Sequence, residues 1–89
     1  MAHRVGLDLG TAFTRIYSLK SGIVLRCPTV AAINEQTGEL VAVGAKAHQM
    51  LGKTTQNVIA VCPIRDGMIS EFFVTAKMLK AMFRETENM

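Results

Sequence analysis

The most constraining feature of this sequence is the decapeptide GLDLGTAFTR at residues 6–15, where a carboxylate and a glycine separate two strand-like segments. Residues 4–9 and 14–19 are rich in the β-branched and aromatic side chains that favour extended backbone. Gly10 lies between the two segments, where the chain must reverse. Glycine suits such a turn, because a residue without a Cβ can adopt a positive φ. The sequence therefore predicts two antiparallel strands joined by a tight turn.

The rest of the chain predicts a mixed α/β (α+β) domain. A strand at 23–26 would complete an antiparallel meander with the first two, and strands at 29–33 and 39–43 would form a hairpin. We also expect a strand at 57–62, a turn at 66–67, a short helix at 45–51 and one long helix from Val74 to about Glu85. Gly52 would cap the first helix in the left-handed region. The second helix is amphipathic, because its apolar residues recur at helical spacing and predict a buried stripe: Val74, Met78, Leu79, Met82 and Phe83.

Composition excludes several classes of function. The chain has 89 residues, which is enough for one small domain or part of a larger one. Its net charge of +3 comes from scattered Lys and Arg residues, so we expect no nucleic-acid partner. Cys27 and Cys62 lie far apart without zinc-ligand spacing, which favours two reduced, half-buried thiols. With no signal-peptide pattern and no spanning apolar run, we expect a cytoplasmic protein whose membrane contact, if any, is peripheral.

Residues 47–54, AHQMLGKT, differ from the nucleotide-binding pattern GxxxxGK[ST] only at the first position. That pattern requires a strand before the loop and a helix that starts at its Lys-Thr pair. Here a helical stretch precedes Gly52 and a strand-like segment follows Thr54, so the order is reversed. We therefore expect a helix end followed by an exposed Lys53.

The first turn is the better candidate for a phosphate site. Backbone amides of residues 10 to 12 can approach an anion, and Thr11 adds a hydroxyl donor while Ala12 leaves room. Asp8, at the end of the first strand, would suit a hydrated Mg²⁺ on a phosphate. The alternative is an ordinary hairpin, since hairpins use Asp and Gly routinely.

The succession of motifs resembles the amino-terminal part of the MreB family of bacterial actin homologues, from Arg4 to about Arg84. The matching motifs, in order, are DLGTA at 8–12, GIVL at 22–25, VGxxA at 43–47 and PxxDGxI at 63–69. Actin and the heat-shock chaperone ATPases share the first of these more loosely. The resemblance implies part of a ribonuclease H-like actin fold, with subdomain IA formed by 1–27 and 66–89 and subdomain IB by 28–65.

The resemblance also implies an ATP site at the first turn. Gly10, Thr11 and Ala12 would contact the β- and γ-phosphates, and Asp8 would hold Mg²⁺ through water. Arg15 lies near the position of a phosphate-contacting lysine in actin; it either contacts the nucleotide or simply alternates outward on its strand. Two further departures from the family are Phe13, where Asn is common, and Phe73, which replaces an acidic helix-capping residue.

By this resemblance, the chain is an amino-terminal fragment of an ATP-binding, filament-forming cytoskeletal protein that governs cell shape. Expected partners are full-length homologues, the cytoplasmic membrane and the cell-wall synthesis machinery. Only one phosphate loop is present, so the chain alone is not expected to hydrolyse ATP. The alternative is a non-enzymatic interaction module that binds itself or the full-length filament protein. Apolar faces left open in this part of the fold would favour self-association.

Overall fold

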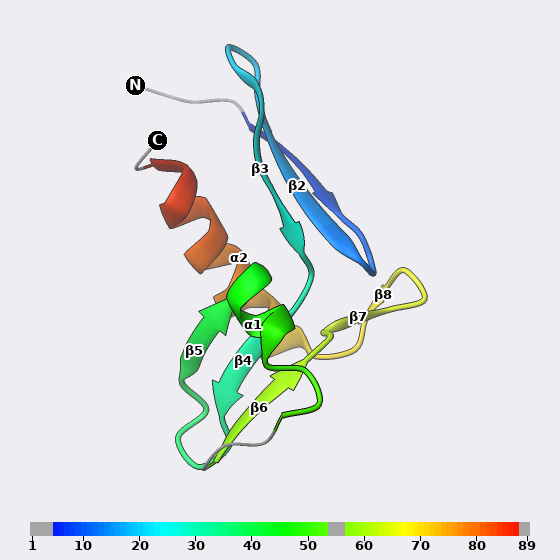
Figure 1. Cartoon of the computed structure of the whole chain (residues 1–89). Helices are drawn as coiled ribbons and strands as arrows, with labels where there is room; N and C mark the ends of the chain where they lie inside the picture. The colour runs from blue at the N-terminus through cyan, green and yellow to red at the C-terminus, as the bar shows by residue number, and fades with distance from the viewer. Residues whose placement is uncertain (1–4, 54–56, 88–89) are drawn as a thin grey trace.

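The computed structural model describes residues 5–53 and 57–87, which form three small antiparallel sheets and two helices (Figure 1). The first sheet contains β1 (Val5–Leu9), β2 (Phe13–Ser18) and β3 (Gly22–Pro28). The second contains β4 (Ala31–Asn34), β5 (Leu40–Val43) and β6 (Val58–Val61), and the third β7 (Ile64–Arg65) and β8 (Met68–Ile69). The helices are α1 (Ala45–Gln49) and α2 (Phe72–Glu87). The mixed α/β prediction is confirmed.

The first sheet is the predicted meander, with strand order β1-β2-β3. In β2 the side chains alternate between two environments, because Thr14 and Ile16 are fully buried whereas Tyr17 is exposed. Leu7 is the cross-strand partner of Ile16, and Asp8 is the partner of Arg15. Asp8 and Arg15 therefore share the outer face of the sheet, opposite the core.

The second sheet has β4 at its centre, flanked by β5 and β6. The expected hairpin of β4 and β5 is confirmed, and the later strand β6 adds to the other edge of β4. Ala31 and Ala32 on β4 are fully buried, because their small side chains let neighbouring elements approach closely.

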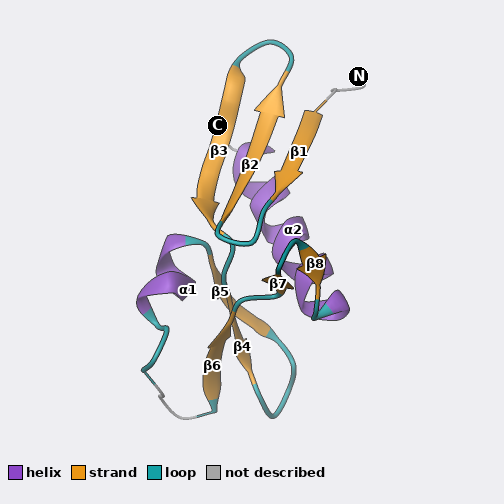
Figure 2. Cartoon of the chain, turned by 90° about the vertical axis from the view of Figure 1, so that its right-hand side faces the viewer, coloured by secondary structure: helices purple, strands orange, loops and turns teal. Residues whose placement is uncertain are grey.

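Helix α2 packs its apolar stripe against both larger sheets (Figure 2). Met78 and Met82 are fully buried and join Ile16 and Ala31 in one core cluster, as the helical spacing predicted. The helix begins at Phe72, two residues earlier than expected from the apolar pattern. Its first turn is closed by the Thr75 amide, which donates to the Glu71 carbonyl, so an acidic side chain at position 73 is not needed to start it.

The remaining turns agree with the sequence in type but not always in length. Helix α1 ends at Gln49, shorter than predicted, and Gly52 has a positive φ of 76° beyond it. Asp66 and Gly67 both have positive φ, the conformation of a tight hairpin turn between β7 and β8. No helix among the described residues is long and apolar enough to cross a membrane.

Candidate functional site

The turn between β1 and β2 is closed by one backbone hydrogen bond. The Gly10 amide donates to the Phe13 carbonyl at 3.0 Å. A Cβ on Gly10 would lie 2.8 Å from that carbonyl oxygen, closer than real Cβ contacts allow. The expectation of a positive φ at Gly10 is wrong, because its φ lies outside the left-handed region. Glycine is required here by the close approach of the Phe13 carbonyl.

Two backbone amides of this turn, those of Thr11 and Ala12, donate to no acceptor among residues 5–53 and 57–87. The Gly10 amide is already used within the turn, so two amides rather than three are free to meet an anion. Both residues are exposed. The turn therefore offers a pair of adjacent donors toward solvent, as an anion site requires.

The side chain of Thr11 contacts a distant part of the chain. Its hydroxyl oxygen accepts a hydrogen bond from the Gly67 amide at 2.9 Å, which fixes the β7–β8 turn against the β1–β2 turn. A threonine hydroxyl also has one proton to donate, so Thr11 keeps a donor for a ligand. Sequence reasoning missed Gly67, since nothing local signals a contact between residues this far apart.

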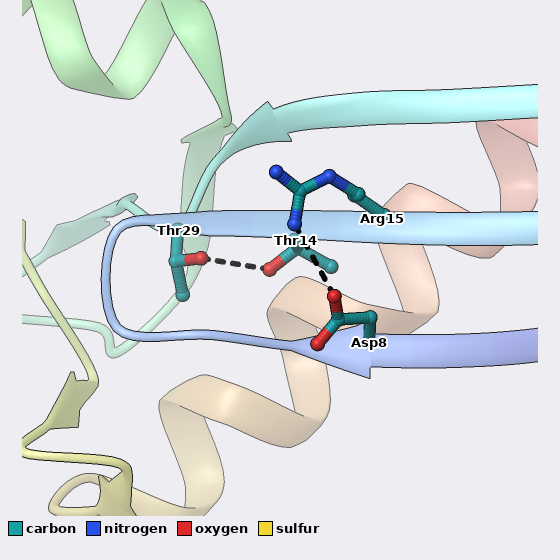
Figure 3. Close-up of polar contacts among 4 residues, drawn as sticks. All are labelled: Asp8, Thr14, Arg15 and Thr29. Carbon is teal, nitrogen blue, oxygen red and sulfur yellow. Dashed lines mark hydrogen bonds and ion pairs between the residues drawn. The ribbon is translucent and has the colours of Figure 1, made fainter. Parts of the chain in front are cut away.

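A pair of buried threonine hydroxyl groups supports the turn. Thr14 and Thr29 are both fully buried and their Oγ1 atoms lie 2.8 Å apart (Figure 3). The Thr29 amide also donates to the Ala12 carbonyl at 2.9 Å. These contacts hold the turn against the segment that leads into the second sheet. The sequence could have predicted that Thr14 points inward, because it alternates along the strand with Ile16. It gave no sign that Thr29 would be the partner of Thr14.

Asp8 and Arg15 form an ion pair on the outer face of the first sheet (Figure 3). Arg15 Nη1 lies 3.2 Å from Asp8 Oδ2, and the two side chains are 34% and 54% exposed respectively. Arg15 thus alternates outward, and it does so beside the predicted metal-binding carboxylate. On the next strand Arg26 is the cross-strand partner of Arg15, and its guanidinium carbon lies 4.8 Å from the Phe13 ring centroid.

The structure gives less support to the other candidate sites. The part of the chain that the structure describes contains no group of three His, Cys, Asp or Glu side chains able to hold a metal. Cys27 and Cys62 are free and half-buried, as predicted. Burial, together with the nearby Glu85 carboxylate, raises the pKa of the Cys27 thiol and keeps it protonated. At the AHQMLGKT segment helix α1 precedes Gly52, as we expected, and Thr54 lies outside the described residues.

Two hollows in the described surface lie away from the turn. One of about 480 Å³ runs along α2 beside Leu79 and Phe83. Another of about 340 Å³ lies beside Val5 and Leu19, at the opposite end of the hairpin. Neither hollow includes Thr11 or Ala12 of the turn, which are exposed.

Comparison with known proteins identifies relatives of this chain. The sequence model of the family described as MreB/Mbl protein matches residues 2–89. The cell shape-determining protein Mbl of Bacillus cereus (strain ATCC 10987 / NRS 248) is 46% identical over 79 residues, covering 89% of this chain and 24% of the relative. The cell shape-determining protein MreB of Escherichia coli (strain K12) is 43% identical over 88 residues, covering 94% of this chain and 25% of the relative.

Solved structures agree with the sequence relatives. The crystal structure of MreB5 of Spiroplasma citri bound to ADP is similar with a TM-score of 0.83 and 35% identity, covering 96% of this chain and 26% of that one. The same protein bound to AMPPNP gives a TM-score of 0.80 and 37% identity, covering 89% and 24%. The chain thus spans about a quarter of the length of the relatives it matches.

Proposed function

This chain belongs to the MreB/Mbl family, and from that premise we propose that it supplies the first phosphate-binding turn of an ATP-binding, filament-forming cell-shape protein. The observation that carries the proposal is the β1–β2 turn, where the Thr11 and Ala12 amides donate to no other described residue. Adjacent backbone donors on an exposed turn suit the oxygens of a phosphate. The nucleotides in the two Spiroplasma citri MreB5 structures support a nucleotide as the ligand.

In this proposal each residue of the turn has a separate role. The amides of Thr11 and Ala12 donate to phosphate oxygens, and the Thr11 hydroxyl adds a third donor. Gly10 holds the turn tight enough to present them. Arg15, on the outer face and in contact with Asp8 near the end of β1, would balance phosphate charge.

Asp8 fits an indirect role toward Mg²⁺. Mg²⁺ keeps several waters and is usually bound through one or two carboxylates and the substrate phosphates, so a single exposed carboxylate beside the turn is compatible with it. When bound, Mg²⁺ neutralises charge on the phosphates. Asp8 would orient the waters of the hydrated ion and hold it beside the turn.

We propose the same division into subdomains as the family resemblance implied, with 1–27 and 66–89 in subdomain IA and 28–65 in subdomain IB. The end of β3 at Pro28 supports the first limit, whereas the second falls within the β7–β8 hairpin, between paired strands. The proposed nucleotide contacts then all come from subdomain IA. Because phosphoryl transfer needs groups on both sides of the phosphate, we expect no ATP hydrolysis by this chain alone.

The test is a chimaera in which this chain replaces the matching quarter of Spiroplasma citri MreB5. Mg-ATP binding, measured by isothermal titration calorimetry, should be retained. Thr11→Lys should abolish it, because the longer side chain fills the space over the turn. The matched control is Thr37→Lys on the β4–β5 turn, also an exposed turn threonine, which should leave binding unchanged. Equal binding by both variants would contradict the proposal.

A second candidate function, binding to itself or to a full-length homologue without catalysis, is favoured by exposed apolar side chains near the start of α2. Met68, Phe72 and Phe73 are 72%, 68% and 79% exposed, more than a stable isolated surface usually presents. Co-sedimentation with MreB filaments should persist in Thr11→Lys if this activity is separate from nucleotide binding. The cytoplasmic membrane and the cell-wall synthesis machinery remain predicted partners of the same assembly.

A further inference from the structure

We propose that Arg15 competes with a divalent cation for the Asp8 carboxylate, so that the metal binds only after this ion pair opens. The inference rests on the proposed phosphate site and adds a regulatory role for one residue beside it. Arg15 would then be a positioning residue, acting on the metal through Asp8.

The geometry leaves the two cations in direct conflict. The Arg15 guanidinium lies 3.2 Å from Asp8 Oδ2, within the space that a metal or its waters would enter. Because Asp8 and Arg15 are cross-strand partners on the same face, the sheet register itself holds them together.

Arg26 is the other arginine on this face. It is the cross-strand partner of Arg15 on the far side from Asp8. Its own guanidinium is held over the Phe13 ring. Of the two arginines, it is Arg15 that donates a hydrogen bond to Asp8. A phosphate at the turn would offer Arg15 a second anion and so help release the carboxylate.

The test uses the 89-residue chain and Mn²⁺ as a paramagnetic probe for the metal. The measurement is the Mn²⁺ concentration that half-broadens the amide NMR signals of residues 8–12. An exposed pair of this kind contributes up to about 1 kcal/mol, so Arg15→Leu should lower that concentration by about two- to five-fold. Arg15→Lys should give an intermediate value, because lysine keeps the charge but not the planar geometry.

The matched control is Arg26→Leu, which removes an equal charge from the same face. Arg26 is two strands away from Asp8, roughly 10 Å and about one Debye length at 0.1 M salt, so its removal should change the concentration little. Broadening near the exposed Glu35, on the other turn, is the internal reference and should be the same in all variants. Dispersion of the amide signals verifies the fold of each variant.

The outcomes separate this inference from the proposed function. Equal effects of Arg15→Leu and Arg26→Leu, or no effect of Arg15→Leu, would overturn the competition while leaving the phosphate site intact. Absence of any broadening at residues 8–12 in every variant, with ATP added, would also overturn the competition, whereas loss of Mg-ATP binding by the chimaera would overturn the proposed function. A selective effect of Arg15→Leu supports the proposal.

Discussion

Two turns of this molecule join antiparallel strands in contrasting ways. The β4–β5 turn closes itself, because the Asn34 side-chain oxygen accepts from the amides of Gln36 and Thr37 at 2.9 and 3.2 Å. The Thr37 hydroxyl in turn accepts from the Glu39 amide. Polar side chains of this turn thus satisfy its own backbone, a common device of turns built for structure alone.

The β1–β2 turn uses its polar groups differently. The Thr11 hydroxyl contacts Gly67 and the Ala12 carbonyl contacts Thr29, both outside the turn. Its amides at Thr11 and Ala12 donate to none of its own side chains. Both turns have distant partners, since in the second the Glu35 amide donates to the Asn57 carbonyl at 2.7 Å and Lys77 Nζ donates to the Gly38 carbonyl at 2.8 Å. The difference lies in the local amides: side chains of the second turn accept from its own amides, whereas those of the first leave the Thr11 and Ala12 amides without an acceptor among the described residues.

The largest expected loss of stability comes from adding a Cβ at Gly10 in the β1–β2 turn. Gly10→Ala should destabilise the fold by about 2 to 3 kcal/mol, because the new atom meets a backbone carbonyl that cannot move freely. Gly38→Ala in the second turn should cost about 1 kcal/mol, from its positive φ alone. Urea unfolding followed by circular dichroism measures both. Equal losses would remove the distinction between a turn held by contact and one held by conformation.

Removing one member of the buried hydroxyl pair should have the next largest effect. Thr14→Val leaves the buried Thr29 hydroxyl without its partner and should cost about 1 to 2 kcal/mol. The double variant Thr14→Val with Thr29→Val should recover part of that loss in the same urea experiment. A simple sum of the two single losses would mean that the hydroxyls contribute independently.

Loss of side-chain oxygens should separate the two turns by function. Asn34→Ala removes two backbone contacts and should lower stability by about 1 kcal/mol, with no change in nucleotide binding by the chimaera. Thr11→Val removes one exposed contact and should lower stability by only about 0.5 kcal/mol while weakening Mg-ATP binding. Unfolding and calorimetry on the same samples give both values. The reverse ranking of binding effects would contradict the assignment of the phosphate turn.

The smallest effect on stability is expected at Asp8. Asp8→Asn breaks an ion pair whose members are both partly exposed, so the loss should be no more than about 0.5 kcal/mol. The same change should nevertheless abolish the Mn²⁺ broadening at residues 8–12. A large loss of stability would instead make Asp8 a structural residue, like Asn34 in the β4–β5 turn.

The sequence predicted the elements better than their contacts. The β-branched and aromatic residues at 4–9 and 14–19 identified the first two strands. The apolar spacing of α2 identified the core helix, because a buried face imposes a period. The Asp66-Gly67 turn was also predictable, since few residues adopt its positive φ values. The start of α2 at Phe72 was not, because exposed residues at a helix end carry no periodic signal.

At the candidate site the residue types were predictable but their partners were not. DLGT indicated a turn with a donor hydroxyl and a carboxylate. That Gly67 and Thr29 would meet this turn depends on how the sheets pack, which no local pattern records. The ion pair of Asp8 and Arg15 follows from the register of one hairpin, and it could have been derived by pairing the strands around Gly10.

Thr29 is attached to the first turn twice, through its amide to Ala12 and its hydroxyl to Thr14, and it begins the segment that enters β4 two residues later. Local opening of the turn must therefore pull on β4, the central strand of the second sheet, so the two regions should exchange their amide hydrogens for deuterium at related rates. A ligand that stabilises the turn would then slow hydrogen exchange in β4, which the ligand does not contact.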